Sequence, residues 1–233
     1  AGGAFSLLVH DRNDAPELVD VHRFVNVWEK TTSLDLRHGR PEAIDAYASH
    51  GRITGGDTEA MIDVAYTAWR TDTVAGRATV LVTDSNESVR ELNQRARTDL
   101  ILDGTIGGTR EVELHDGSHA AAGEKVITRR NDRRLRAGRS WVRNGDRWTV
   151  TGIRGGNLAV RHRDSGLTTV PPAEYVAADV ELGYASTVHT AQGLTADVMH
   201  GVVTGEETRQ LLYTMLTRGR AENHVHVITD DLG

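Results

Sequence analysis

The sequence contains no cysteine among its 233 residues, which excludes disulfide bonds and thiolate metal sites and fits a reducing cytoplasm. No run of 18 apolar residues occurs, so we expect no membrane insertion. The N-terminal stretch AGGAFSLLVHDRND lacks a basic segment followed by a long apolar one, so we do not expect a secretory signal. Aromatic residues are scarce at 5%, but 38% of the residues are hydrophobic, which suffices for a core in a chain of this length.

The charge is distributed unevenly along the chain. The formal net charge is −6, which taken alone argues against nucleic acid as a partner. Between Lys125 and Arg147, however, eight arginines occur against two acidic residues, Asp132 and Asp146. A local basic segment matters more for binding phosphate than the total charge does. The sequence therefore predicts either a phosphate-binding patch here or a solvated loop that acidic residues elsewhere balance.

The apolar pattern predicts an α/β organisation. The run ATVLVTD, residues 78–84, is typical of a buried parallel strand, and an amphipathic segment follows it at once, with Ser85 or Asn86 placed to cap a helix. Residues 33–72 also have helical spacing, interrupted by SHGRITGGDTEA. A buried strand that leads into an amphipathic helix is the basic unit of α/β folds.

A different pattern occupies residues from about 105 to 175. Short alternating stretches such as EKVITRRND and RWTVTGIRGGNLAVRHRDSGLTTVP are separated by turn sequences, which indicates antiparallel strands in a small barrel or meander. After residue 176 the α/β pattern returns. We therefore expect an α/β domain formed by residues 1–108 and 176–233, interrupted by a β-rich insertion at residues 109–175.

Polar residues stand at several places where a core has no need of them. The stretch ASTVHTAQGLTAD, residues 185–197, lies between two apolar strands. Arg23 is flanked by apolar residues, and Arg218 and Arg220 follow an apolar helix. An arginine at the end of a buried element is costly without an anionic partner, and its forked donors match phosphate oxygens. An ordinary ion pair for Arg23 and a position at a helix C-terminus for Arg218 are the alternatives.

Read together, these segments resemble the C-terminal motor half of superfamily 1 helicases of the RecD-like branch, and most closely the helicase region of MobF-type conjugative relaxases, the TraI and TrwC class. AGGAFSLL is similar to the residues that follow the third helicase motif, and LVDVHRFVNVWEKTTSLDLRHG is similar to motif IV. YASTVHTAQGLTAD resembles motif V, LLYTMLTRGRAENHVHV resembles motif VI, and GEKVITRRND with SWVRNGDRWTV resembles the β-barrel insertion of that family.

The resemblance implies an α/β fold, with a RecA-like P-loop NTPase-type parallel sheet and a small antiparallel, SH3-like β-barrel insertion. It implies that Arg23 and Arg218 act on the γ-phosphate, with Arg218 as the arginine finger. It places Gln192, Gly193 and Arg220 at the nucleotide interface. It assigns contacts with single-stranded DNA to Thr187, His189, Thr190, Arg129, Arg130 and Asn131. The residues after Gly193 depart from the family pattern, so a ribose or metal role for Asp197 is not expected.

Two catalytic signatures of the family are absent from the sequence. It contains neither a G-x-x-x-x-G-K-[ST] phosphate loop with an acidic pair for Mg²⁺ nor a three-histidine cluster with a tyrosine pair. We therefore expect that the chain alone neither hydrolyses ATP nor nicks DNA, and that ATP and Mg²⁺ bind the intact motor rather than this chain. The partners implied are single-stranded DNA, the N-terminal RecA-like domain and relaxase domain of a parent protein, and the conjugative secretion machinery. The polarity implied is 5′ to 3′.

An alternative reading is a non-catalytic module, derived from a helicase domain, that binds single-stranded DNA or a protein partner. An α/β hydrolase is not supported, because no G-x-S-x-G sequence occurs. The candidates for stacking on bases are Trp141, Trp148 and Tyr184. His224 and His226 alternate in a strand-like stretch and are expected on one exposed face rather than at a metal site.

Overall fold

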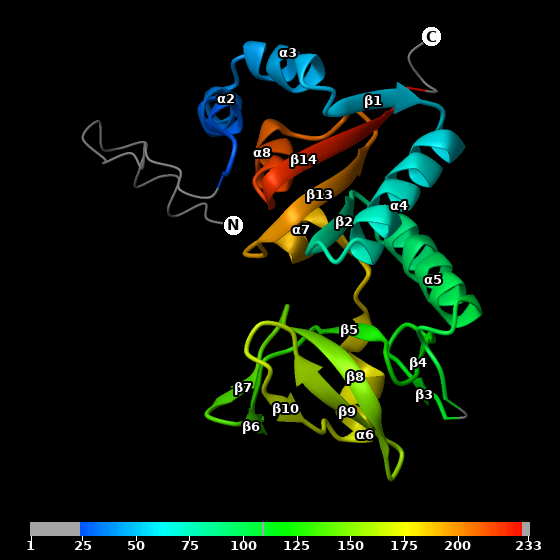
Figure 1. Cartoon of the computed structure of the whole chain (residues 1–233). Coiled ribbons are helices and arrows are strands. Elements are labelled where there is room, and N and C mark those ends of the chain that lie inside the picture. The colour runs from blue at the N-terminus through cyan, green and yellow to red at the C-terminus, as the bar shows by residue number, and fades with distance from the viewer. Residues whose placement is uncertain (1–23, 109, 230–233) are drawn as a thin grey trace.

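The computed structural model describes residues 24–108 and 110–229, which form two units, one above the other in Figure 1. The upper unit is a parallel sheet between layers of helices. Its strand order is β1 (Ile53–Gly56), β14 (Gly219–Ile228), β13 (Ala196–Val203), β2 (Thr79–Thr83) and β12 (Ala185–Thr187). Each neighbouring pair is parallel. This arrangement confirms the expected α/β sheet.

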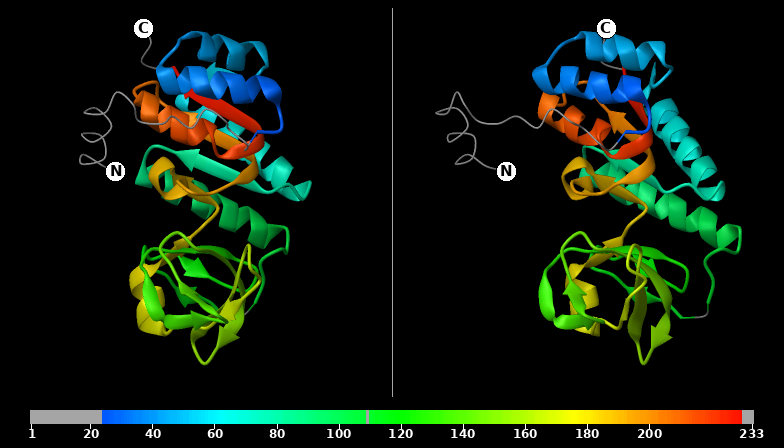
Figure 2. Two further views of the ribbon diagram at one scale, coloured as in Figure 1. Left: turned by 90° about the vertical axis from the view of Figure 1, so that its left-hand side faces the viewer. Right: turned by 60° about the vertical axis from the view of Figure 1, so that its left-hand side comes forward.

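Both faces of the parallel sheet are covered by helices. α4 (Thr58–Val74) and α5 (Asn86–Leu102) lie on one face, and α8 (Arg209–Leu216), α7 (Val188–Ala191), α2 (Val27–His38) and α3 (Glu42–Ser49) lie on the other (Figure 2). The central strand β2 contributes to both cores, because Leu81 packs into the cluster with α4 and α5 while Val80 and Val82 pack into the cluster with α8. Such a strand has no polar face, and this accounts for its continuous apolar run.

The unit formed by β2 and α5 matches the sequence prediction closely. Ser85 is the N-cap of α5, and its side chain accepts a hydrogen bond from the Ser88 amide at 3.1 Å. Leu92 and Ala96 are buried on the face of α5 that meets the sheet. The helix therefore begins where a polar cap satisfies its first amides, and its apolar stripe fixes which side it buries.

The lower unit is antiparallel. Its main sheet has the order β10 (Thr168–Thr169), β9 (Asn157–His162), β8 (Arg147–Arg154), β5 (Lys125–Thr128) and β11 (Val180–Leu182). The unit also contains two hairpins and a helix. The first hairpin is β3 (Val112–Glu113) with β4 (His119–Ala120), the second is β6 (Asp132–Ala137) with β7 (Ser140–Val142), and the helix is α6 (Ala173–Asp179). The main sheet extends past residue 175, where the sequence suggested that the insertion ends, because β11 pairs with β5. We call residues 110–182 the insertion.

The chain returns from the insertion to the parallel sheet through a short connection between β11 and β12. Asn93 of α5 holds this connection: its amide nitrogen donates to the Leu182 carbonyl at 3.2 Å, and its side-chain oxygen accepts from the Tyr184 and Ala185 amides at 3.0 and 2.8 Å. The side chain is buried, so these three bonds satisfy groups that have no access to water. One polar side chain thus ties the helix layer to the return strand.

Two elements differ from the sequence predictions. The segment interpreted as a break between helices contains β1, which forms because Ile53–Gly56 pairs with β14 at the edge of the sheet. The expectation of an exposed histidine face is wrong for His226, which is 3% exposed. His226 lies on a sheet that is covered on both faces, and its ring lies near that of His200, whose Nε2 is 2.8 Å from Asp72 of α4.

Within the described residues, no helix combines the length and the apolar character needed to cross a bilayer.

Candidate functional site

The residues from Thr187 to Thr195 form a short helix and a turn at the carboxyl end of β12. Thr187 caps α7, with its Oγ1 accepting from the Thr190 amide at 3.3 Å. His189 and Gln192 are exposed, and Gly193 follows with φ of +89°, a conformation that favours glycine. We call residues Ala191–Ala196 the α7–β13 loop. Its exposed polar groups lie beyond the carboxyl ends of the parallel strands, where α/β proteins commonly bind ligands.

The insertion approaches this loop from the opposite side. The Arg129 guanidinium donates to Thr190 Oγ1 at 2.8 Å, and its Nε lies 3.4 Å from Glu181. Between the two elements lies a cavity of about 410 Å³ lined by Arg129, Asn144, Gly145, His189, Thr190 and Gln192. The structure therefore brings together Thr190, His189, Gln192 and Arg129, four residues that the sequence assigned from two distant segments.

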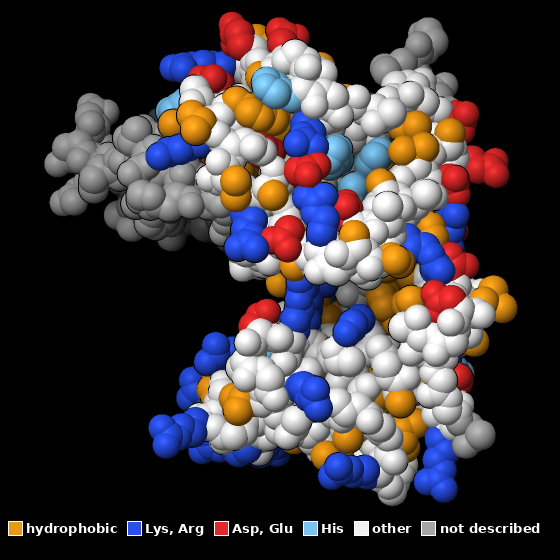
Figure 3. Space-filling model, viewed as in Figure 1, with side chains coloured by type: hydrophobic (Ala, Val, Ile, Leu, Met, Phe, Trp, Pro, Cys, Tyr) orange, Lys and Arg blue, Asp and Glu red, His pale blue; other side chains and the backbone are white. Residues whose placement is uncertain are grey.

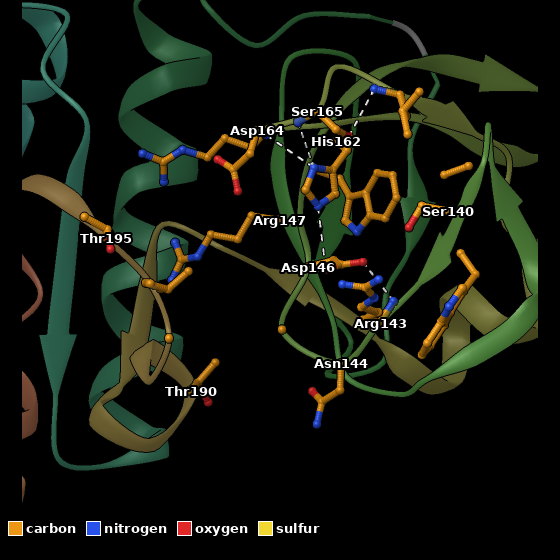
Figure 4. Close-up of a pocket in the computed structure, with 18 of the residues that line it drawn as sticks. Ser140, Arg143, Asn144, Asp146, Arg147, His162, Asp164, Ser165, Thr190 and Thr195 are labelled. Atoms are coloured by element: carbon orange, nitrogen blue, oxygen red, sulfur yellow. Dashed lines mark hydrogen bonds and ion pairs between the residues drawn. The ribbon is translucent and has the colours of Figure 1, made fainter.

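A larger hollow of about 600 Å³ continues from this cavity, and we call the two together the interdomain cleft. Figure 4 shows Thr190 and Thr195 on one side of it and Arg143, Asn144 and Asp146 on the other. Trp141 lines the insertion side and lies below both Arg133 and Arg143, whose guanidinium carbons are 5.5 and 5.2 Å from its ring centroid. The cleft thus offers an aromatic ring close to two cations, together with exposed amide and hydroxyl groups.

His162 organises the floor of the cleft. Its Nδ1 accepts hydrogen bonds from the Asp164 and Ser165 amides at 3.3 and 3.2 Å, so the proton lies on Nε2, which is 3.6 Å from Asp146 Oδ1. Its ring packs edge to face on Trp148, with centroids 4.9 Å apart. Asp146 in turn accepts from the Arg143 amide at 2.8 Å, which fixes the turn that presents Arg143. Sequence patterns did not predict this arrangement, because it depends on side-chain contacts between separate strands.

The other sequence candidates in the insertion lie differently. Arg130 pairs with Asp179 at 2.7 Å and lies over the ring of Tyr175. The side-chain oxygen of Asn131 accepts from the Asn144 amide at 3.0 Å, so it supports the hairpin. Neither residue lines the cleft.

Two of the three aromatic candidates are largely buried and present little ring surface to the interdomain cleft. Trp148 is 2% exposed, and its Nε1 donates to Thr128 Oγ1 at 3.3 Å. Tyr184 is buried, with its hydroxyl donating to Glu124. Trp141 remains accessible, since it is half-buried in the wall of the cleft.

Arg218 lies at the C-terminal end of α8, 7% exposed. Its Nε donates to the Thr214 carbonyl at 2.7 Å, and its Nη1 lies 3.4 and 3.3 Å from the carbonyls of Ala191 and Leu194. A cation here meets the negative end of the helix dipole and its unpaired carbonyls. Arg218 therefore joins α8 to the α7–β13 loop, which is the loop that borders the cleft.

Arg220 and Asp197 form an ion pair at 2.5 Å near the start of β13. Asp197 also accepts from the Ala78 amide at 2.9 Å, and this backbone bond, followed by Arg220, lowers the pKa of the carboxyl group. These contacts give Asp197 a structural part, because it joins the start of β13 to the amino end of β2. Arg23 lies outside the described residues. Among those described, no cluster of three or more acidic or histidine side chains is arranged to hold a metal ion.

The arrangement, a parallel α/β sheet with an inserted antiparallel unit, is similar to that of known helicases. Residues 182–228 match the family model described as UvrD-like helicase C-terminal domain, and residues 1–58 match the model described as AAA domain. The Pif1 helicase from Bacteroides, solved in complex with ADP-AlF3 and ssDNA, has a TM-score of 0.57 over 88% of this chain and 50% of that chain, at 16% identity. The Pif1 helicase from Candida albicans has a TM-score of 0.51 over 86% and 53%, at 13% identity.

The sequence is homologous to conjugal transfer proteins. It is 27% identical over 97% of its length to the probable conjugal transfer protein TraA of Sinorhizobium fredii, and 28% identical over 95% to the conjugal transfer protein TraA of Agrobacterium fabrum. In both cases the chain spans 20% of the relative's length. The chain is thus a helicase-like domain that is homologous to the TraA proteins and shares its fold with Pif1 helicases, which confirms the resemblance stated from the sequence.

Proposed function

We propose that this chain is the second RecA-like domain of a helicase motor in a conjugal transfer protein. In this role Arg218 acts on the phosphates of ATP bound by another domain, and the interdomain cleft holds single-stranded DNA. The relatives are conjugal transfer proteins many times longer than the segment they share with this chain, which supports a parent protein with further domains. A relaxase domain and the secretion machinery are the further partners that such a parent protein would have.

The observation that carries the proposal is the shared loop. Arg218 bonds to the carbonyls of Ala191 and Leu194, while Gln192 and Thr195 of the same loop line the cleft. If Arg218 turns toward a phosphate, these hydrogen bonds break and the loop is free to shift. A change in the bound nucleotide then shifts the loop that contacts the DNA strand, because Arg218 makes different contacts in the two conformations.

The cleft has the chemistry that a single strand needs. Arg129 and Arg143 provide cations for the phosphates, and Trp141 provides a ring on which a base can stack. Thr190 and Asn144 add neutral groups that can bond to sugar and phosphate oxygens. That the related Pif1 fold was solved with single-stranded DNA supports this assignment.

ATP and Mg²⁺ are proposed to bind the intact motor. The sequence has no phosphate loop of the G-x-x-x-x-G-K-[ST] type, and its two lysines are followed by Thr31 and Val126 without that glycine spacing. The residues of this chain assigned to the nucleotide in the proposal are Arg218 and Arg23, with Gln192, Gly193 and Arg220 at the interface with the nucleotide-binding domain. Their part is to stabilise charge on the transferred phosphoryl group, not to hold the metal.

The DNA assignment can be tested by measuring the salt dependence of binding to a labelled oligodeoxythymidine. Loss of one phosphate contact should reduce the slope of log K against log salt by about 0.7. We expect this reduction for Arg143→Gln and for Arg129→Gln. Arg154→Gln, an exposed arginine at the β8–β9 turn, should bind as the wild type does. Absence of salt-dependent binding at low ionic strength would exclude a DNA role for the chain.

The nucleotide assignment is tested in the full-length protein. We expect Arg218→Ala to reduce DNA-stimulated ATP hydrolysis by roughly 10³ to 10⁵ while single-strand binding is retained. Circular dichroism and thermal unfolding check that α8 remains folded. Turnover equal to that of the wild type would refute the assignment.

One observation favours a second candidate, a binding module without a motor cycle. Arg218 is bonded within the domain and barely exposed, so it already has a structural use. If Arg218→Ala weakens DNA binding and leaves ATP hydrolysis by the full-length protein unchanged, the binding module is the better description.

A further inference from the structure

A second pocket of about 490 Å³ lies between the two units, and we call it the amino-end pocket. Its lining includes Trp69 of α4, Ala78 and Thr79 at the amino end of β2, Lys125 of β5 and Arg147 of β8. The interdomain cleft, in contrast, adjoins Thr190 beyond the carboxyl end of β12. Because β2 and β12 are parallel, the two hollows lie toward opposite ends of the sheet. The role proposed above does not use the amino-end pocket.

The charge of the amino-end pocket is of one sign. Four cationic residues line it, namely Arg77, Lys125, Arg147 and Arg163, and no acidic residue does. Arg77 is paired, with Asp72 at 2.9 Å and Glu222 at 2.7 Å. In the described part of the chain, the other three have no carboxylate within the 4.0 Å of an ion pair. Figure 3 shows the waist between the units hollowed, with Lys and Arg side chains gathered beside apolar ones.

Arg147 is the most unusual member of the set. It is 9% exposed, and its guanidinium donates to the Gly183 carbonyl and to Ser186 Oγ, both at 3.0 Å. Its Nε is buried without a hydrogen-bond partner. Burial, and then the charge of Arg163, lowers the pKa of Arg147 to about 10, so it stays charged at neutral pH. A buried cation with two neutral partners and one unused donor is destabilising unless an anion completes its contacts.

The remaining wall is apolar and aromatic. Trp69, Leu100, Val126, Trp148 and Tyr184 all contribute to it. A bare inorganic anion would leave this wall unused, whereas a ligand with both a phosphate and a flat ring would satisfy the cations and cover the apolar surface. The volume is within the usual range for small-molecule sites, roughly 300 to 1,000 Å³.

We propose that the amino-end pocket binds a nucleotide, with its phosphate held by Arg147, Arg163 and Lys125 and its base against the apolar wall. Arg147 supplies the fixed donor, because packing and two hydrogen bonds hold its guanidinium. Arg163 and Lys125 are exposed and close the phosphate end; Lys125 Nζ is already positioned by Thr149 Oγ1 at 2.8 Å. A free nucleotide and a nucleotide within a DNA strand share this chemistry.

The test uses the 233-residue chain and its tryptophan fluorescence, since Trp69 and Trp148 both line the pocket. The probes are deoxyadenosine monophosphate, deoxyadenosine, inorganic phosphate and an oligodeoxyadenosine. We expect the monophosphate to bind more tightly than either deoxyadenosine or phosphate alone. Arg163→Gln and Lys125→Gln should each weaken it by about fivefold or more, and Arg154→Gln should not. Both substituted residues are exposed, so the fold should be retained.

The outcomes separate the sources of the ligand. Binding of the monophosphate that both Lys125→Gln and Arg163→Gln weaken supports a free nucleotide in the amino-end pocket. Binding of the oligonucleotide alone, weakened in the same way, supports a nucleotide within a strand. If no probe binds, or if Arg143→Gln weakens the monophosphate while Arg163→Gln does not, the proposal is overturned. Lys125→Gln separates these results from the DNA assignment of the interdomain cleft, because Lys125 lines the amino-end pocket and not the cleft, whereas Arg163 borders both.

Discussion

Acidification should destabilise this protein through the buried side chain of His226. Both ring nitrogens of His226 are buried without hydrogen-bond partners, and its ring lies 5.9 Å from that of His200. Burial, followed by the neighbouring histidines, lowers the pKa of His226 to about 4. In the unfolded chain a histidine titrates near 6.5. Between these two values the unfolded state binds a proton that the native state does not, so stability is complete above about pH 6.5 and is lost as the pH falls.

The size of the effect follows from the two pKa values. From about pH 7.5 to about pH 5, His226 alone should lower the free energy of unfolding by about 2 kcal/mol. Burial also lowers the pKa of His200, although the hydrogen bond to Asp72 opposes this, so His200 acts in the same direction. Burial acts to raise the pKa of Glu222, but hydrogen bonds from His224 and Arg77 outweigh it and hold the value at about 2. Glu222 therefore stays ionised throughout this range.

Urea unfolding at the two pH values measures the loss directly. We expect His226→Phe to be as stable as the wild type near pH 7.5, because the imidazole nitrogens have no partners to lose. Near pH 5 the variant should be the more stable of the two by about 2 kcal/mol. His119→Gln, a change at an exposed histidine of β4, should leave the wild-type pH dependence intact. If His226→Phe loses as much stability on acidification as the wild type, the buried imidazole is not the cause.

Two further changes test how the units are joined and how the cleft is shaped. Asn93→Ala should lower the free energy of unfolding in urea by about 2 to 4 kcal/mol, because the Leu182 carbonyl and the Tyr184 and Ala185 amides lose their side-chain partner. An unchanged free energy of unfolding would mean that water replaces the Asn93 side chain. Gly193→Ala should lower the free energy of unfolding by about 1 kcal/mol because residue 193 has a positive φ; the space around it is open, so no clash adds to this cost. The substitution should weaken single-strand binding by more than this loss of stability. Unchanged DNA affinity would show that this turn is not part of the DNA interface.

Local patterns were enough to predict the elements whose chemistry is local. The core of β2, Val80 to Val82, is apolar because both faces of the strand are covered. Ser85 is a favourable N-cap residue, so it marks the start of the helix that follows. The strand β1 could not be predicted in this way. Its sequence, Ile-Thr-Gly-Gly, has little intrinsic preference for a strand, and it forms because β14 offers a free edge.

The candidate site was predictable in part for a similar reason. The motif residues from Thr187 to Gly193 stand in a continuous segment, so their sequence alone placed them together. The residues opposite them in the cleft come from the insertion. Asp146 holds the turn at Arg143, and it faces His162 at the end of β9. Side-chain contacts across strands depend on register, and register was not readable from composition.

Arg147 shows most clearly why residue type alone does not decide a role. In the sequence it is the last of eight arginines in one basic run and is indistinguishable from its neighbours. In the structure Arg133 is exposed beside an aromatic ring, whereas Arg147 is buried where the insertion meets the parallel sheet. The difference arises because β8 begins at Arg147 and passes beneath the connection between β11 and β12. A charge placed there influences both hollows at once, since Arg147 lines the cleft and the amino-end pocket alike. An anion bound in the amino-end pocket would therefore lower the positive potential that the cleft offers to a DNA strand, so the two sites should compete electrostatically even where their ligands do not touch.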